Sequence, residues 1–156
     1  MNKILYITFG FFMVGCNANE TLIDSLNPEF ETMSFDVVQK KLVIEQDLPN
    51  TLNILVSKWF DEKVKINGFN GDMIFTISDY KEETSLISEG KRIDLNLSFN
   101  LLLRKPLLSQ QKLIQGNVSS YGTISGDFSL KDFDTVIKNT QIDLILRLSR
   151  DLQTKI

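Results

Sequence analysis

Residues 91–103 carry the pattern that most constrains the fold of this chain. Apolar side chains occupy alternate positions along this segment: Ile93, Leu95, Leu97, Phe99, Leu101 and Leu103. Polar residues fill the positions between them, with Leu102 as the exception. Because a β-strand directs successive side chains to opposite faces, the pattern predicts a strand with one buried face and one solvated face. Pro106 ends it, since proline cannot donate to a strand ladder.

Three neighbouring segments are also expected to be strands. Residues 35–45 and 72–87 are rich in β-branched and apolar residues, and residues 112–125 combine small and polar residues with two glycines. A turn at Ser88-Glu89-Gly90 joins residues 72–87 to the alternating strand. We therefore expect the last three strands to form a meander.

Two helices complete the pattern. Asp47-Leu48-Pro49 marks the start of the first and Asn67-Gly68 its end. Its apolar residues fall at helical spacing: Leu52, Leu55, Val56, Trp59 and Phe60. The second begins at a cap, Asp127 or Ser129, and runs toward the C-terminus. Its apolar stripe consists of Phe133, Val136, Ile137, Leu144, Leu148 and Leu152.

The element order is therefore β-α-β-β-β-α over residues 34–156. This order predicts one α+β domain, in which two helices pack on one face of a four-stranded, mostly antiparallel sheet. With 42% hydrophobic residues, such a domain can bury a core without disulfides.

Residues 1–15 have the composition of a signal peptide. A charged start at Lys3 precedes an apolar run over residues 4–14, which would span about 17 Å as a helix, too short for a hydrocarbon core of about 30 Å. Cys16, the only cysteine, follows two residues after the end of this run. Met13-Val14-Gly15-Cys16 resembles the bacterial lipobox, which implies cleavage before Cys16 and its acylation. The alternative is a free or buried cysteine near a cleaved signal.

Residues 16–33 then form a polar or mixed tether behind the lipidated cysteine. Two acyl chains on one residue anchor a protein stably, since each buried CH₂ adds about 0.8 kcal/mol. Asn17 follows the cysteine. By the sorting rule of enteric bacterial lipoproteins, which reserves aspartate there for the inner membrane, we expect the outer membrane.

The composition argues against catalysis and nucleic-acid binding. The chain has no histidine and one cysteine, so no His- or Cys-based metal cluster or catalytic pair is expected. Carboxylates at Asp79, Glu82 and Glu83 are more simply a solvated edge than a glycosidase pair. A net charge of −3 disfavours nucleic acid. We expect a protein that is not an enzyme and holds no cofactor or metal.

Two surface features suggest binding. In a meander, Lys91, Arg92 and Lys131 would lie at one end of the sheet, where they would form a basic site for phosphates or other anions; the alternative is three ordinary solvated cations. On the last helix, Ile142, Ile145 and Leu146 lie beside the main stripe. They are a candidate partner interface if exposed, or part of the core if the helix is rotated.

The element order, the lipobox-like Met13 to Cys16, the strand at residues 71–77, the alternating strand and the final helix resemble the lipopolysaccharide-assembly lipoprotein family, LptE. The resemblance covers about residues 35–156. It implies a lipid-anchored outer-membrane protein that sits inside a β-barrel partner of the LptD type and assists lipopolysaccharide transport. It also implies that Lys91, Arg92 and Lys131 contact lipopolysaccharide phosphates. The rival hypothesis is a periplasmic ligand-binding or transporter-accessory lipoprotein with an apolar groove between helix and sheet.

Overall fold

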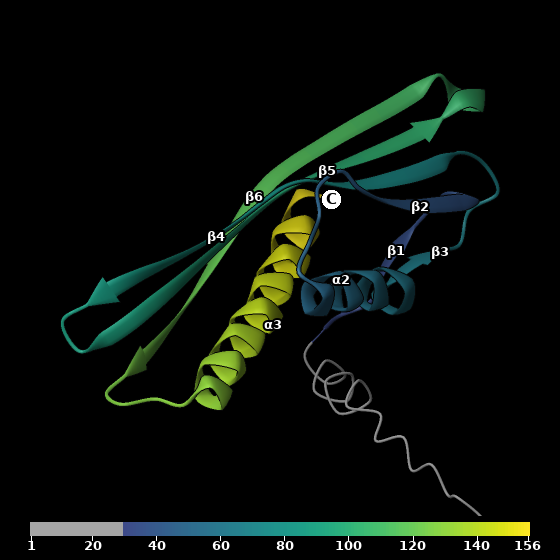
Figure 1. Cartoon of the computed structure of the whole chain (residues 1–156). Coiled ribbons are helices and arrows are strands. Elements are labelled where there is room, and N and C mark those ends of the chain that lie inside the picture. The colour runs from purple at the N-terminus through teal and green to yellow at the C-terminus, as the bar shows by residue number, and fades with distance from the viewer. Residues whose placement is uncertain (1–29) are drawn as a thin grey trace, which may run out of the picture.

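A computed structural model describes residues 30–156, in which two helices lie on one side of a long, twisted sheet (Figure 1). The elements in chain order are β1 (Met33–Phe35), β2 (Gln39–Ile44), α2 (Asn50–Lys63), β3 (Val64–Ile66), β4 (Asp72–Ile87), β5 (Gly90–Lys105), the 3₁₀ turn η1 (Pro106–Leu108), β6 (Gln110–Ser125) and α3 (Leu130–Lys155).

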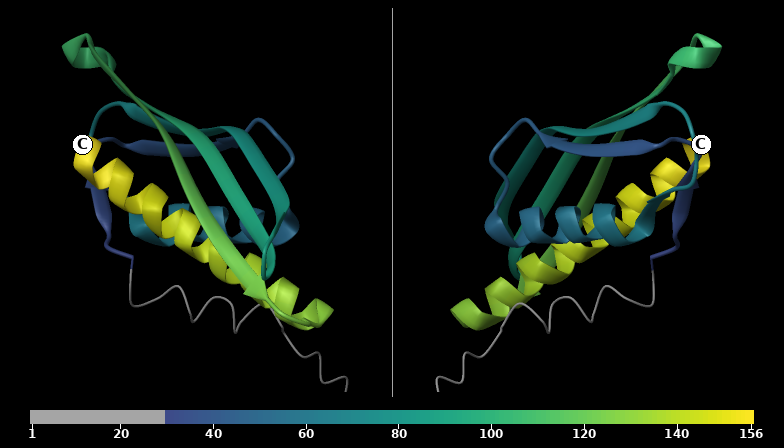
Figure 2. Two further views of the ribbon diagram at one scale, coloured as in Figure 1. Left: turned by 90° about the vertical axis from the view of Figure 1, so that its left-hand side faces the viewer. Right: turned by 90° about the vertical axis from the view of Figure 1, so that its right-hand side faces the viewer.

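The main sheet has four strands in the order β2-β4-β5-β6. β5 pairs antiparallel with both β4 and β6, whereas β2 runs parallel to β4 because α2 crosses between them. Two side views show both helices against the same face of the sheet (Figure 2). The predicted α+β fold, with its mostly antiparallel four-stranded sheet, is confirmed.

A second, two-stranded sheet pairs β1 with β3 in parallel and was not anticipated. Each of these strands has three residues, too few for an alternating pattern to show in the sequence. The chain enters this small sheet through Phe30 and Met33, whose side chains are buried, although both residues fall in the segment expected to be tether.

The core lies between the sheet and the helices. The alternating residues of β5 are buried from Ile93 to Leu101, as its central position in the sheet requires. Phe75 of β4 stacks on Phe99 with ring centroids 5.5 Å apart, and Trp59 of α2 meets Phe75 edge-on at 5.4 Å. These contacts join α2 to the two central strands.

β4 contains a bulge at Ser78. Its pairing with β5 shifts between Ile77 and Asp79, so β4 carries one residue more than its partner there. Before the bulge the buried residues are Met73, Phe75 and Ile77, and after it the buried residue is Tyr80. The bulge therefore changes which of the odd or even positions face the helices.

The sheet divides at this bulge into two parts. The body contains β2, residues 72–77 of β4, residues 99–105 of β5 and residues 110–116 of β6. The arm contains residues 79–98 of β4 and β5 with residues 117–125 of β6, and it extends beyond β2 at the lower left of Figure 1. The arm is therefore a three-stranded continuation of a four-stranded body.

α3 begins near the end of the arm and crosses back toward the body (Figure 1). Its first turn is held by a capping box: the Asp132 amide donates to Ser129 Oγ at 3.2 Å, and the Ser129 amide donates to Asp132 Oδ2 at 2.9 Å. Gly122 of β6 lets the helix approach closely, since a Cβ there would collide with Thr140 and Val136. Neither α2 nor α3 is both long and apolar enough to cross a membrane.

Candidate functional site

Residues 1–29 lie outside the described part of the chain, which starts at residue 30. Lipidation of Cys16, the signal peptide and most of the tether therefore remain predictions from sequence. The candidate cations and the candidate interface on α3 lie within the described residues.

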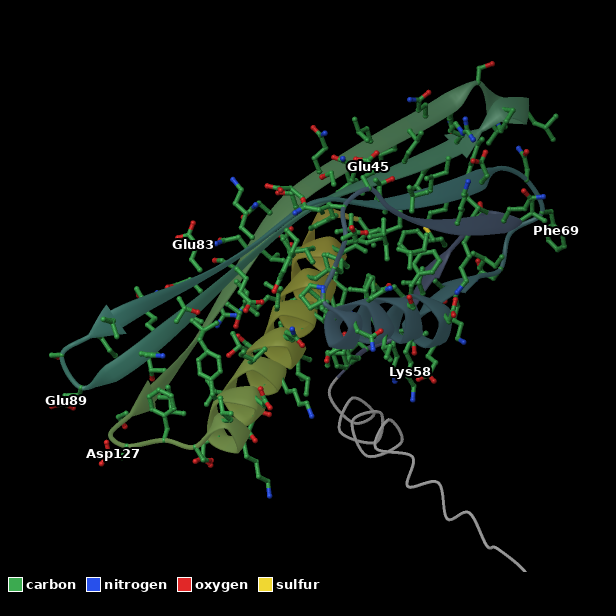
Figure 3. All side chains as sticks on the ribbon, in the orientation of Figure 1. Glu45, Lys58, Phe69, Glu83, Glu89 and Asp127 are labelled. Atoms are coloured by element: carbon green, nitrogen blue, oxygen red, sulfur yellow. The ribbon has the colours of Figure 1, made fainter. Side chains whose placement is uncertain are left out.

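The end of the arm brings two distant turns together, as expected for a meander. The Gly126 amide, which follows β6, donates to the Glu89 carbonyl of the β4–β5 turn at 3.0 Å. Glu89 and Asp127 mark this end in Figure 3. At the other end of the sheet, Lys112 Nζ donates to the carbonyl of Ile156 at 3.0 Å, so the C-terminus lies there.

Lys91 is held over two aromatic rings on the helix-facing side of the arm. Its Nζ lies 5.3 Å from the ring centroid of Phe128 and 5.7 Å from that of Phe133. The two rings stack on each other with centroids 6.1 Å apart. Such rings attract a cation through their electron-rich faces and fix its position, so Lys91 presents an oriented ammonium group.

Arg92 occupies the opposite face of the same strand. Its guanidinium stacks over Tyr121 at 4.3 Å and forms an ion pair with Asp94, with Nη2 2.7 Å from Oδ1. The hydrogen bond from Arg92 holds the pKa of the Asp94 carboxyl below its ordinary value. Because its charge is already paired with a carboxylate, Arg92 is a weaker candidate for an anion than Lys91.

Lys131 lies in the first turn of α3 and is exposed. It follows Phe128 and precedes Phe133, the two residues that hold Lys91. The structure thus associates Lys91 with the segment that carries Lys131, and it turns Arg92 to the other face. Because alternation along β5 places Lys91 and Arg92 on opposite faces, a ligand would have to reach around the edge of the arm to contact all three cations.

Ile142, Ile145 and Leu146 do not form an exposed surface. Ile145 is 0% exposed and Leu146 is 8% exposed, while Ile142 is partly buried against the core. The expected exposure of these residues is wrong, and the rotated helix is the correct alternative. The reason is that α3 contacts β5 and β6 and also α2, so two neighbours bury a wider sector of the helix than one sheet would.

A polar cluster joining α3 to β6 was not found from sequence. Ser120 Oγ donates to Asp143 Oδ2 at 2.6 Å, and Arg147 Nε donates to the same oxygen at 2.7 Å. Burial raises the pKa of the Asp143 carboxyl, but the hydrogen bonds from Ser120 and Arg147 outweigh it and leave the pKa below its ordinary value. The helical spacing of Asp143 and Arg147 was a signal for this pair; the contribution of Ser120 depends on the strand register.

The sheet face away from the helices carries rows of amides and hydroxyls. Gln115 Nε2 donates to Asn100 Oδ1 at 2.8 Å, and Asn117 Nδ2 donates to Ser98 Oγ at 2.8 Å. These pairs link β5 to β6 across this face. The solvated face of the alternating strand is therefore polar and largely uncharged near its middle.

Two hollows on the described surface are open to solvent. One of about 380 Å³ lies on the side of α2 that carries Lys58, which points away from the sheet in Figure 3, and one of about 340 Å³ lies at the β5–β6 turn beside Lys105 and Lys112. Neither lies between helix and sheet. Among residues 30–156 there is no group of three or more carboxylates or other ligands arranged to hold a metal ion.

Comparison with known proteins relates the fold to bacterial lipoproteins. No protein-family model matches the sequence, and no curated protein matches it. The structure is similar to rare lipoprotein B from Shewanella oneidensis, with a TM-score of 0.50 and 12% identity over 75% of this chain and 95% of that one. A minor lipoprotein from Acinetobacter baumannii gives a TM-score of 0.49 and 13% identity over 73% and 90%. The shared property at this identity is the fold.

Proposed function

We propose that this chain is a lipid-anchored outer-membrane lipoprotein that associates with a β-barrel partner of the LptD type and assists lipopolysaccharide transport without catalysing a reaction. The observation that carries the proposal is the similarity of the domain to rare lipoprotein B, with residues 13–16 of the sequence resembling a lipobox. A domain of this fold behind an acylated cysteine would be held at a membrane by its N-terminus.

Two surfaces support this role. The polar face of the sheet, with its amide and hydroxyl pairs, suits the wet interior of a large barrel. At the end of the arm, Lys91 fixed over Phe128 and Phe133 offers a positioned cation for a lipid phosphate. Lys131 adds a second exposed charge on the same segment.

Co-purification tests the partner directly. We expect the tagged chain, solubilised in mild detergent, to bring down a large outer-membrane barrel protein, and depletion of the chain to leave lipopolysaccharide inside the cell. Cys16→Ser should accumulate as uncleaved, mislocalised precursor. Recovery of the chain without a barrel protein, together with normal lipopolysaccharide export after depletion, would refute the proposal.

Lipopolysaccharide binding is tested separately. Lys91→Ala should weaken binding of purified lipopolysaccharide, whereas Lys41→Ala, which removes an exposed lysine from β2 in the body, should not. Equal binding by the two variants would show that Lys91 does not contribute to lipopolysaccharide binding. It would not contradict the proposed association with a barrel protein. The rival role, a carrier of an apolar ligand, has no support from the described hollows, and a bound lipid found by mass spectrometry would favour it.

A further inference from the structure

The hydrogen-bond ladder on the outer side of β4 ends at Tyr80. β2 pairs with β4 as far as Ile77, and the Glu45 amide donates to the Ile77 carbonyl at 3.0 Å. Beyond this point the side chain of Gln46 takes over: its Nε2 donates to the Tyr80 carbonyl at 2.9 Å and its Oε1 accepts from the Tyr80 amide at 3.2 Å. A side-chain amide thus makes the two bonds that a neighbouring strand would make.

The backbone groups of the alternate residues after Tyr80 also point away from β5, but no side-chain amide pairs with them. Ile87 and Gly90 close the β4–β5 hairpin around a two-residue turn, so Ile87 and every second residue before it bond to β5. The backbone groups of Glu82, Thr84 and Leu86 therefore point outward, as those of Tyr80 do. Within residues 30–156 no strand pairs with them, and residues 81–87 are all exposed.

The charges along this stretch are uneven. Lys81 Nζ lies 3.8 Å from Asp79 Oδ2, so Glu82 and Glu83 are the charges nearest the body that have no ion-pair partner among residues 30–156. The Tyr80 hydroxyl donates to Glu82 Oε2 at 2.7 Å and leaves its charge unpaired. Residues 84–87 carry no charge, and Leu86 and Ile87 are 82% and 40% exposed. Edge strands are usually protected from pairing by charges or proline. Here the charges lie only at Glu82 and Glu83, and residues 84–87 have no such protection.

We propose that residues 82–87 of β4, the distal edge, bind an extended segment of a partner protein by strand addition. The segment carries lysine or arginine opposite Glu82 and Glu83 and apolar side chains opposite Leu86 and Ile87. Backbone hydrogen bonds provide the attachment, and the charges select the sequence. The inference does not depend on the proposed role in lipopolysaccharide transport.

Charge favours a foreign segment over a second copy. Antiparallel pairing of two copies about Thr84 would set Glu82 of each against Leu86 of the other, which desolvates a carboxylate beside a leucine. A basic and apolar segment instead meets every residue of the distal edge with a complementary side chain.

A peptide tests the proposal on the full chain in mild detergent. We expect a capped peptide of sequence Ile-Val-Thr-Thr-Lys-Lys to slow hydrogen exchange at the amides of Glu82, Thr84 and Leu86, measured by NMR. The same peptide with glutamate in place of lysine should bind roughly tenfold more weakly, and one with methylated backbone nitrogens should not bind.

Thr84→Pro is the informative variant, because it removes an amide that points outward while the bonds to β5 remain. It should weaken binding of the lysine peptide roughly tenfold, whereas Thr84→Val, which keeps the amide, should bind as the parent does. Should the proline variant fail to fold, Glu82→Lys with Glu83→Lys offers a second test, since it should reverse the preference between the two peptides.

Three results would overturn the proposal. The first is unchanged exchange at these amides when the peptide saturates the solution. The second is protection that rises with protein concentration in the absence of peptide, which would assign the edge to a second copy. The third is protection in the free chain at every concentration, which would assign it to the chain's own N-terminal residues.

Discussion

The body and the arm share strands β4, β5 and β6, yet the residues of these strands are buried to different extents in the two parts. In the body β4 has a neighbour on each side, and its alternate residues Met73, Phe75 and Ile77 are at most 1% exposed. In the arm β4 is an edge strand, and from Lys81 onward every residue is exposed. β5 keeps its alternation through both parts because it is central throughout.

This difference shows that the composition of a strand does not by itself decide whether its side chains are buried. Burial in this sheet depends more on the number of neighbouring strands and on whether a helix covers the strand. Leu86 and Ile87 are as apolar as the residues of the body, but among the described residues no helix covers them and β5 is their only neighbouring strand. Stability should therefore concentrate in the body, and binding surface in the arm.

Substitutions on one strand should show the largest contrast. Phe75→Ala leaves a cavity between Trp59 and Phe99, and we expect it to lower the free energy of unfolding by roughly 3–5 kcal/mol. Leu86→Ala on the same strand should change it by less than about 0.5 kcal/mol. Urea denaturation followed by circular dichroism measures both. Similar losses for the two variants would mean that the arm is packed as tightly as the body.

Gly122→Ala tests the close packing of α3 on the arm. A Cβ there would meet Thr140 and Val136 of α3. The helix must then shift away from β6, at a cost of roughly 1–3 kcal/mol in the free energy of unfolding. Adding Thr140→Ala should recover part of the loss in the same denaturation experiment. A neutral Gly122→Ala would show that α3 lies loosely on the arm.

Ser129→Ala removes the cap of α3 at the end of the arm. Because the Asp132 amide loses its acceptor, we expect a loss of about 1 kcal/mol. If the arm is the less stable region, hydrogen exchange should accelerate in the first turns of α3 and leave β5 in the body unchanged. Faster exchange throughout the domain would instead indicate one cooperative unit.

The smallest effect concerns pH. The pKa of Asp143 is lowered in the folded chain, so its contribution to stability is present above the unfolded pKa of about 3.9 and is lost as the pH falls through the folded value. Asp143→Asn should flatten the decline in thermal stability below about pH 4. Ser120→Ala, which removes one of the hydrogen bonds to that carboxyl, should flatten it less. An unchanged slope in both variants would exclude Asp143 as a source of the acid sensitivity.

Much of the fold could be predicted because it follows from periodicity. The alternation of β5, the helical spacing around Leu55 and Trp59, and the cap at Ser129 each indicate an element that the structure contains. β1 and β3 left no periodic signal. The parallel pairing of β2 with β4 depends on where α2 returns the chain, which no local pattern records.

The candidate site was less predictable because it depends on faces and neighbours. Lys91 and Arg92 are adjacent in sequence and lie on opposite faces of the arm, which alternation already implies. The rings that hold Lys91 come from the loop and helix after β6, so only the tertiary fold shows them. Likewise, Ile145 is buried in a helix that packs against both the sheet and α2, which only the tertiary fold shows.

The bulge at Ser78 has a consequence for how variation acts on this protein. β4 bends there because it is one residue longer than the stretch of β5 it follows. Substitutions keep the number of residues constant, so a substitution scan would not test the effect of the extra residue in the bulge. Deleting Ser78 should instead keep each side chain on its present face while straightening the sheet. Distances between spin labels placed on the arm and on the body would measure the new direction of the arm. The angle between the two parts therefore depends on the number of residues in β4.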